Sequence, residues 1–391
     1  IKNNEYLIFK MKKKFFNLIK IVSLVCIFFN FYNINSFADV VPASTDTTID
    51  TTVDLQGLVK ENRTYNITSS AVYRIEAPIN SSSYSITKTG NGTLVFNDTN
   101  ITNFSADVII TNGTVAASNN NTLGEGTVRL NGGTLSSDST GARSLSNDIS
   151  VQVSSELGDA TNSGTLTLSG NLDFTAGDII LSSRSDNEIS GTVNLNNNPT
   201  FSIDSSVTQT LSGDVSNGAL NKSGSGILVL SGTNTYSGDT NISAGTLNVS
   251  GLLNSGTYSG KIDNSGTFTF SSNSDQILSG DIEGSGTLTK SGSSTLTLSG
   301  TNIYSGTTTI SDGTLALSGT ESLSVNTAVT VESGASFNVD ASNTVGSITG
   351  AGTIDIADKE VLTVGGDNSS TIFSSPGIID GFGALIILEL I

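Results

Sequence analysis

Apolar and polar residues alternate along short stretches of this chain, and small polar residues separate the stretches. In Thr295–Leu298 the two leucines share one face of an extended strand and the two threonines share the other. Ile227–Leu230 keeps the apolar positions, and the Ser-Gly-Thr-Asn at 299–302 is typical of a turn. Gly and β-branched residues recur throughout, without a sustained helical period. The pattern predicts many short strands.

Two long segments of this pattern are near-copies of each other. Residues 220–251 and 288–319 align without a gap at 22 of 32 identical positions, with Leu220 matching Leu288. A weaker copy spans 86–117, and Thr165–Gly170 matches a fragment. Strands with one apolar face cannot bury that face alone, so we expect successive coils to stack around a shared core. The predicted fold is all-β, a right-handed parallel β-helix (β-solenoid) of about 15 coils, each with three sides and about 23 residues.

Residues 1–38 have the features of a secretory signal. Met11 is the only methionine, so residues 1–10 are interpreted as an upstream extension or a nonstandard start. Residues 11–38 begin with basic residues, continue with an apolar stretch and end in Ser-Phe-Ala. This order predicts a signal peptide cleaved between Ala38 and Asp39. The alternative is an N-terminal membrane anchor, although polar residues interrupt the apolar stretch.

Composition and charge narrow the classes of function. The net charge is −18, and residues 1–38 hold six of the 17 basic residues and one of the 35 acidic ones, so the processed chain would be more acidic still. An acidic surface repels phosphate backbones, so nucleic acid is not an expected partner. Without histidine, Ser-His-Asp and Cys-His catalytic arrangements cannot form, and neither a metal site nor a cofactor is expected. Cys26 would leave with the signal, so no disulfide would brace the processed chain.

The motif shared by the copies reads L-x-K-x-G-x-G-x-L-x-L-x-G-x-N-x-Y-x-G-x-T-x-I-x-x-G-T-L. It resembles the passenger-associated transport repeat, also called the autotransporter-associated β-strand repeat. The positions that carry the resemblance, and to which it assigns a structural role, are Lys222, Gly224, Leu228, Leu230, Asn234, Tyr236, Gly238, Thr240, Ile242, Gly245 and Leu247 in one copy and Lys290, Gly292, Leu296, Leu298, Asn302, Tyr304, Gly306, Thr308, Ile310, Gly313 and Leu315 in the other.

The resemblance implies a passenger region that an outer-membrane β-barrel translocator exports, with the repeats assisting export and folding. We recognise no run of alternating strands of barrel length in this sequence, so the translocator is expected to be absent from this chain. Under this interpretation residues 39–85 form an N-terminal non-repeat cap, 86–375 the β-helix passenger, and 376–391 a truncated or frameshifted tail. A complete short secreted protein is the alternative.

Paired carboxylates are the remaining candidates for catalysis, because two acids of different pKa can cleave a glycoside. Asp281 and Glu283 lie on one face of an expected strand, as do Asp355 and Asp358. We interpret all four as solvated acids on the outer face of the coils. No catalytic residue is therefore assigned.

Two tyrosines at equivalent positions of the copies, Tyr236 and Tyr304, are candidates for a sugar-binding platform, but packing at equivalent turns is favoured. The sequence thus predicts a non-enzymatic autotransporter passenger, surface-exposed or secreted by a Gram-negative bacterium. It would act as a structural or adhesive β-helix, with a host-cell or matrix molecule as ligand. A β-helix enzyme that cleaves polysaccharides, and a non-functional remnant of a split autotransporter gene, remain alternatives.

Overall fold

The computed structural model describes residues 39–40, 62–67, 72–75, 80–81, 83–97, 103–139, 141–161, 164–320, 322–365 and 378–388. The chain divides into two compact units, Ile1–Val40 and Val41–Ile391. Strand β1 (Asp39–Val40) is the described part of the first unit. The expected signal peptide, including Ala38, therefore lies outside the described residues.

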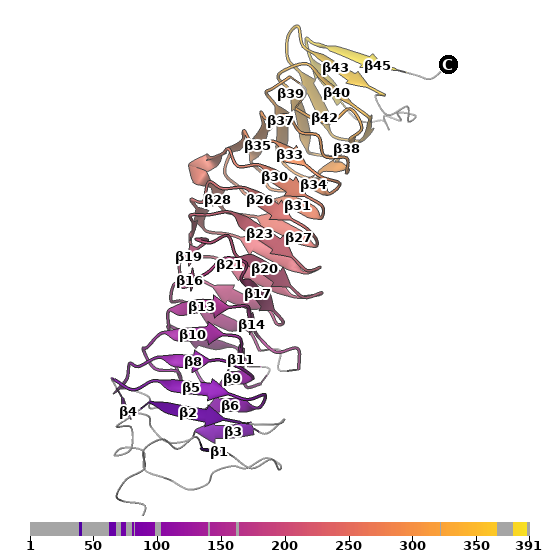
Figure 1. Cartoon of the computed structure of the whole chain (residues 1–391). Coiled ribbons are helices and arrows are strands. Elements are labelled where there is room, and N and C mark those ends of the chain that lie inside the picture. The colour runs from indigo at the N-terminus through magenta and orange to yellow at the C-terminus, as the bar shows by residue number, and fades with distance from the viewer. Residues whose placement is uncertain are drawn as a thin grey trace, which may run out of the picture. The chain divides into compact units, whose positions relative to one another are not determined.

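The second unit is a parallel β-solenoid of about 14 turns, which confirms the predicted fold class (Figure 1). Its handedness stays a prediction. Inside each long sheet, a strand pairs in parallel with the strand one turn earlier and the strand one turn later, so that Ile86, Val108, Val128, Ile149 and Leu172 are successive register partners. The spacing between partners varies slightly from turn to turn. This stacking pairs the backbone amides of each strand with its neighbours and leaves one face of each strand for the core.

Four long sheets form the sides of the solenoid, and we number them by order of appearance along the chain. Sheet I consists of β2 (Arg63–Asn66), β5 (Ile86–Thr89), β8 (Val108–Ile110), β10 (Val128–Asn131), β13 (Ile149–Val153), β16 (Leu172–Phe174), β19 (Val193–Asn194) and β22 (Val215–Ser216). Sheet II consists of β3 (Val72–Ile75), β6 (Thr93–Phe96), β9 (Thr114–Ala117), β11 (Thr134–Ser137), β14 (Ser155–Leu157), β17 (Ile180–Ser183), β20 (Thr200–Ile203), β23 (Leu220–Ser223), β26 (Thr240–Ile242), β30 (Ile262–Asn264) and β33 (Ile282–Glu283).

The third side and the later turns are built in the same way. Sheet III consists of β12 (Arg143–Leu145), β15 (Leu166–Leu168), β18 (Asn187–Ile189), β21 (Thr208–Leu211), β24 (Ile227–Leu230), β27 (Thr246–Val249), β31 (Thr267–Phe270), β34 (Thr287–Lys290), β36 (Thr308–Ile310), β38 (Ala328–Val331) and β41 (Ser347–Gly350). Sheet IV consists of β29 (Thr257–Tyr258), β32 (Gln276–Leu278), β35 (Thr295–Leu298), β37 (Thr314–Leu317), β39 (Ser336–Val339), β42 (Thr353–Ile356) and β44 (Ile378–Gly381). Three small sheets are β4 (Asn80–Ser81) with β7 (Asn103–Phe104), β25 (Thr233–Asn234) with β28 (Leu252–Leu253), and β40 (Asn343–Val345) with β43 (Val361–Val364) and β45 (Ala384–Ile387).

From β13 to β24 the chain passes through sheets I, II and III in that order. At β29 and again at β32 a strand of sheet IV precedes the strand of sheet II, where a strand of sheet I stood before. A 3₁₀ turn at Asn254–Gly256 comes directly before β29, the first strand of sheet IV. Its three residues have positive φ angles of 40°, 57° and 96°. Such angles are costly for Asn and Ser, so this turn is a site of backbone strain.

Alternation of side chains builds the core. In Thr267–Phe270 and Thr295–Leu298 the apolar residues are buried and the threonines are half-buried on the outside. The buried residues form one continuous apolar cluster that extends from Tyr65 to Val364. The sequence pattern predicted this arrangement because the period of two sets which residues face inward.

Stacked glycines form the corner that follows sheet III. A Cβ atom on Gly191 would lie 1.9 Å from the carbonyl oxygen of Gly170, one turn earlier, and one on Gly213 would lie 2.0 Å from that of Gly191. The next turn repeats the contact, with 2.3 Å between a Cβ on Gly232 and the carbonyl of Gly213. Real Cβ atoms do not approach backbone this closely, so each turn needs glycine here.

The two near-copies do not lie on the same side of the solenoid. Leu220 begins a strand of sheet II, whereas Leu288 lies in a strand of sheet III. Three turns along sheet II lead from Leu220 through Thr240 and Ile262 to Ile282, and Leu288 comes one side later. The offset between the copies therefore corresponds to three turns and one side. The expected coil length, which assumed three whole turns between the copies, is too large here.

Candidate functional site

A buried lysine occupies the same position in three of the repeated segments. Lys88, Lys222 and Lys290 are at most 1% exposed and point into the core. The Lys88 Nζ donates to the carbonyls of Thr89 (2.8 Å), Gly90 (2.7 Å) and Asn112 (3.1 Å). The first two carbonyls belong to its own corner and the third to the next turn. The ammonium therefore joins two turns.

The other two lysines make equivalent contacts. The Lys222 Nζ donates to the carbonyls of Ser223 (2.8 Å), Gly224 (2.7 Å) and Ala244 (3.1 Å). The Lys290 Nζ donates to those of Gly292 (2.5 Å) and Asp312 (3.2 Å). In each case the last acceptor directly precedes a glycine with positive φ, Gly113, Gly245 or Gly313. A Cβ on any of these glycines would lie within 2.8 Å of the Nζ, so the invariant Gly-Thr of the motif leaves room for the ammonium.

Burial makes these ammonium groups weaker bases than an exposed lysine. Desolvation lowers the pKa of Lys88 and of Lys222 from 10.5 to about 8. Desolvation also lowers the pKa of Lys290, with the nearby charges of Asp312 and Asp275 acting in the opposite direction. Among the described residues, the ion pairs do not include these three lysines. The direct hydrogen-bond partners of these ammonium groups are backbone carbonyls.

Inward-facing register partners on successive turns form a column of side chains in the core. In this column each lysine lies between an aromatic residue of the turn before and an isoleucine of the turn after. Tyr65, Phe201 and Phe270 are the register partners one turn earlier. The partners one turn later are Ile110, Ile242 and Ile310. The motif's isoleucine thus packs directly over the motif's lysine.

The two tyrosines of the motif lie inside the solenoid and do not face solvent. Tyr236 and Tyr304 are 1% and 0% exposed. The hydroxyl of Tyr304 is hydrogen-bonded to Thr308 (2.5 Å), and that of Tyr236 to Thr240 (3.0 Å). Burial raises the pKa of Tyr236 to about 12. An aromatic platform for a sugar needs an exposed ring face, which these rings do not offer.

The remaining motif residues are also structural in their contacts. The Asn234 amide donates to the carbonyls of Gly232 (3.0 Å) and Leu252 (2.9 Å). The Asn302 carbonyl oxygen accepts from the Ile282 backbone N–H at 2.8 Å, and its amide donates to the carbonyl of Ser322. Six leucines of the motif are at most 1% exposed: Leu228, Leu230, Leu247, Leu296, Leu298 and Leu315. The motif glycines Gly238 and Gly306 stack on Gly218 and Gly286, where a Cβ would lie 2.2 Å and 2.0 Å from a carbonyl oxygen.

The candidate carboxylates lie on the outside and are engaged in structural contacts. The Asp281 Oδ1 accepts from the backbone N–H of Thr301 (2.8 Å), one turn later. Asp239 caps Lys261 in the same way (2.9 Å), so Asp281 belongs to a series of corner caps. The Glu283 carboxylate lies 2.5 Å from the Lys261 Nζ, with both side chains partly exposed. Sequence reasoning placed these acids outside but did not find their partners, which come from neighbouring turns.

The second candidate pair was expected to share one face of a strand, but Asp355 lies in β42 and Asp358 lies beyond the end of that strand. Both side chains are exposed. Burial, and then the charge of Asp355, raise the pKa of Asp340. Sequence reasoning did not name Asp340, because the contact depends on stacking of two turns. None of these three acids lines either groove described below.

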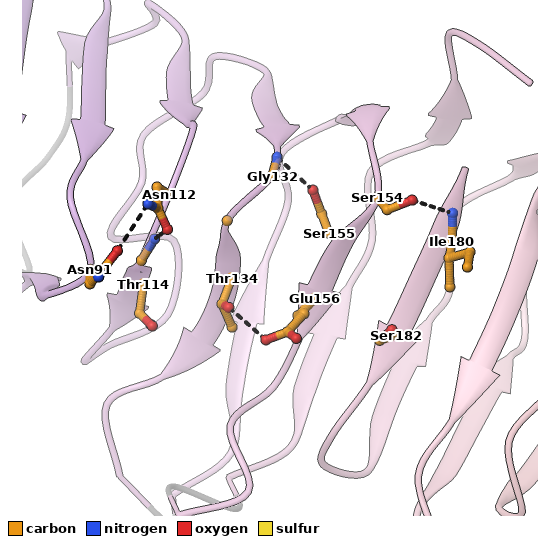
Figure 2. A pocket seen from close by; sticks show the side chains of 12 residues that line it. Asn91, Asn112, Thr114, Gly132, Thr134, Ser154, Ser155, Glu156, Ile180 and Ser182 are labelled. Atoms are coloured by element: carbon orange, nitrogen blue, oxygen red, sulfur yellow. Dashed lines mark hydrogen bonds between the residues drawn. The ribbon is translucent and has the colours of Figure 1, made fainter. Parts of the chain in front are cut away.

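A shallow polar groove of about 440 Å³ runs over sheet II (Figure 2). Its floor carries Thr114, Thr134, Glu156 and Ser182, which are outward-facing register partners on successive strands. The Thr134 hydroxyl donates to the Glu156 carboxylate (3.0 Å), whose other oxygen lies 2.6 Å from the Arg184 guanidinium. Glu156 is the one carboxylate among the lining residues, so the groove lacks the acid pair of a glycosidase.

Backbone turns form the rim of this groove. The Asn112 amide donates to Asn91 (2.9 Å), and Ser154 accepts from the backbone N–H of Ile180 (2.9 Å) (Figure 2). A second groove of about 360 Å³ lies along the corner of Ser212, Ser231 and Ser250. The residues that line both grooves contribute mainly hydroxyls, amides and backbone, with one carboxylate in each groove, Glu156 and Asp214.

Within the described part of the chain, no group of three or more acidic, Cys or His side chains is arranged to hold a metal ion. No helix there has the length and apolar character needed to cross a membrane.

A family model described as Passenger-associated-transport-repeat matches residues 86–117, 160–182, 220–249 and 288–317. Three of these matches cover the segments that hold the buried lysines. The chain carries passenger-associated transport repeats. Such repeats are typical of autotransporter passenger regions. Neither the curated proteins nor the solved structures include a match to this chain.

The passenger-associated transport repeat at 160–182 differs from the other three. It is shorter and contains no lysine, and sequence reasoning identified only its Thr165–Gly170 fragment. For the three full-length repeats, the boundaries placed from the sequence agree closely with the family matches. Sequence reasoning did not assign the lysines a buried role, although Lys222 and Lys290 continue the inward alternation of Leu220 and Leu288.

Proposed function

We propose that this chain is the passenger of an autotransporter, secreted or exposed on the surface of a Gram-negative bacterium, and that it acts by binding. The four family matches, spread along one continuous β-solenoid, are the observation that supports this function. An outer-membrane translocator is the partner required for export. The predicted cleavage between Ala38 and Asp39, and the division into residues 39–85, 86–375 and 376–391, remain part of the proposal.

An adhesive role is supported by the outer surface of the solenoid. Its long sheets present rows of polar side chains, and the groove over sheet II exposes hydroxyl and amide groups along several turns. Of the four candidate acids, Asp281 is a corner cap and Glu283 an ion-pair partner. Binding of a host-cell or matrix molecule along a side face is therefore the action that fits these residues.

Surface display is the first test. In the bacterium that encodes the chain, antibodies raised against the purified protein would label intact cells or detect the product in the medium. Protease added to intact cells would remove the cell-bound signal. A product confined to the cytoplasm would contradict the passenger assignment.

Adhesion is tested separately with purified residues 39–391 on cultured host cells and matrix proteins. Saturable binding with a dissociation constant in the micromolar range or tighter would support the adhesive role. Replacing Thr134 and Ser182 in the groove with Val and Ala would reduce that binding, while the matched change Thr269→Val on sheet III would not. Absence of saturable binding to all of these surfaces would remove the adhesive role and leave the display result intact.

A further inference from the structure

Each full-length repeat stacks on itself. In residues 220–249, the first-half strands β23 and β24 pair directly with the second-half strands β26 and β27. Leu220 lies below Thr240 and Lys222 below Ile242 on sheet II. Leu228 lies below Leu247 on sheet III. One repeat thus contains both partners of the turn-to-turn pairing on two of the three sides, whereas on the third side β25 pairs with β28, which lies beyond the repeat.

Side chains hold the two halves together from both directions. The Lys222 Nζ donates upward to the carbonyl of Ala244 (3.1 Å). The Ser243 hydroxyl and backbone N–H donate back to the carbonyl of Lys222, at 3.1 Å and 2.9 Å. Both partners of every one of these bonds lie within the repeat.

The same reciprocal contacts recur in the other two full-length repeats. Thr111 donates through its hydroxyl to the carbonyl of Lys88 (2.9 Å), and Ser311 to that of Lys290 (3.2 Å). The apolar pairs recur as well, with Leu94 below Val115 and Leu296 below Leu315.

These three repeats lie on different pairs of sheets. Residues 86–117 use sheets I and II, residues 220–249 use sheets II and III, and residues 288–317 use sheets III and IV. Their positions around the solenoid therefore differ, while the internal contacts stay the same. The turn before each repeat also supplies an aromatic residue below the lysine, so the recurring pattern consists of the internal contacts and this one neighbour.

We propose that each full-length passenger-associated transport repeat is a self-closing clasp, in which the first half forms the floor on which the second half stacks and locks. On two sides of the turn, the contacts that define the clasp involve no residue outside the repeat. Each one is therefore a local folding unit, which closes as soon as its second half reaches the first. This inference concerns folding and stands whether or not the chain proves to be an adhesin.

The match at 160–182 serves as an internal contrast. Its strand β15 pairs with β18 (Asn187–Ile189), which lies outside the match. It has no lysine and covers about one turn, so it cannot stack on itself. We expect this segment to open and close with its neighbours.

Native-state hydrogen exchange of the purified chain tests the clasp. Exchange is followed by mass spectrometry at increasing, sub-denaturing urea concentrations. Within each full-length repeat, the first-half and second-half strands would exchange with the same free energy and the same urea dependence. The exchange of β15 would instead follow that of β18. If the two halves of a repeat exchanged independently, each in step with its flanking turn, the clasp would be refuted.

A variant localises the effect. Lys222→Ala removes the ammonium and would speed exchange in both halves of residues 220–249 by at least tenfold, with the repeats at 86–117 and 288–317 unchanged. Phe201→Ala, one turn below in the same column, is the matched control and would speed exchange in the first half more than in the second. Equal acceleration across all three repeats after Lys222→Ala would contradict local closure. If Lys222→Ala prevents folding, the exchange pattern of the unaltered chain still decides the question.

Discussion

The turns built by residues 220–249 and the spacer built by residues 183–211 have the same three-sided shape but differ in what they bury. The repeat buries an ammonium and a tyrosine hydroxyl, at Lys222 and Tyr236. The spacer turns bury mostly aliphatic residues, with polar contacts such as Ser183 to Gln209 (2.8 Å). The shape therefore depends on alternation and on small residues at the corners, which both regions share. The buried ammonium meets its carbonyl acceptors in the observed register, so we expect it to add specificity to the stacking of the repeat.

Glycine substitutions at the corners are expected to remove the difference between the two regions, because they should destabilise the repeat and the spacer equally. Gly191→Ala in the spacer and Gly238→Ala in the repeat each place a Cβ within 2.2 Å of a backbone carbonyl. We expect each to lower the free energy of unfolding by about 3 kcal/mol, measured by urea unfolding followed by circular dichroism. Gly177→Ala is the control, since its nearest heavy atom is 3.9 Å away. Equal stability of Gly191→Ala and Gly177→Ala would show that the corners can shift.

The pH dependence of stability separates the repeats from the spacer, because the three buried lysines all lie in full-length repeats. The pKa of Lys88 and Lys222 falls from 10.5 to about 8 on folding, so folding releases protons between these pH values. The destabilisation from burying the charge is complete below pH 8 and disappears as the pH rises towards 10.5, by up to about 3 kcal/mol for each lysine. Above pH 10 the trend reverses, because burial raises the pKa of Tyr236 from 10.0 to about 12 and the unfolded chain loses that proton first.

The measurement is urea unfolding between pH 7 and pH 11, with maximal stability expected near pH 10. Replacing Lys88, Lys222 and Lys290 with Met largely preserves the side-chain length and removes the ammonium groups. In this triple variant the rise in stability between pH 8 and pH 10 would disappear. An unaltered rise in the variant would assign it to other groups.

The smallest expected effect compares one hydroxyl in each region. Tyr304→Phe removes the bond to Thr308, and Ser183→Ala removes the bond to Gln209. Each is expected to lower the free energy of unfolding by about 1 kcal/mol, as is typical of a buried neutral hydrogen bond. Thermal unfolding of both variants against the unaltered chain measures the difference. A loss above about 3 kcal/mol for Tyr304→Phe alone would indicate that the buried tyrosine hydroxyl, and not the lysine, distinguishes the repeat from the spacer.

Much of the fold could be predicted from the sequence because the relevant signals are local. The alternation in Thr295–Leu298 sets which side chains face inward, and the near-identity of 220–251 and 288–319 indicates stacked units. The side on which each copy lies could not be predicted, because the offset between the copies is compatible with several coil lengths. Turn lengths such as that of the 3₁₀ turn at Asn254–Gly256 decide between them.

The chemistry of the repeat was harder to predict than its outline. The alternation does place Lys222 in line with Leu220, but a charged residue is not expected in a core unless partners are known. Its partners are backbone carbonyls from two turns, among them Gly224 and Ala244, and these come together only on stacking. The cap between Asp281 and Thr301 was missed for the same reason.

The placement of the repeats on different sides bears on how such genes change in length. The main stacking partners of each repeat lie within the repeat. The spacing between two repeats therefore needs to be a whole number of sides, and it does not need to be a whole number of turns. Duplication or loss of about a third of a turn would then move the next repeat by one side, with new strand pairing at the junction and unchanged contacts inside each repeat. Copies of this unit can therefore be inserted, lost or moved along the gene in small increments, and selection need only preserve what each new orientation shows to the outside.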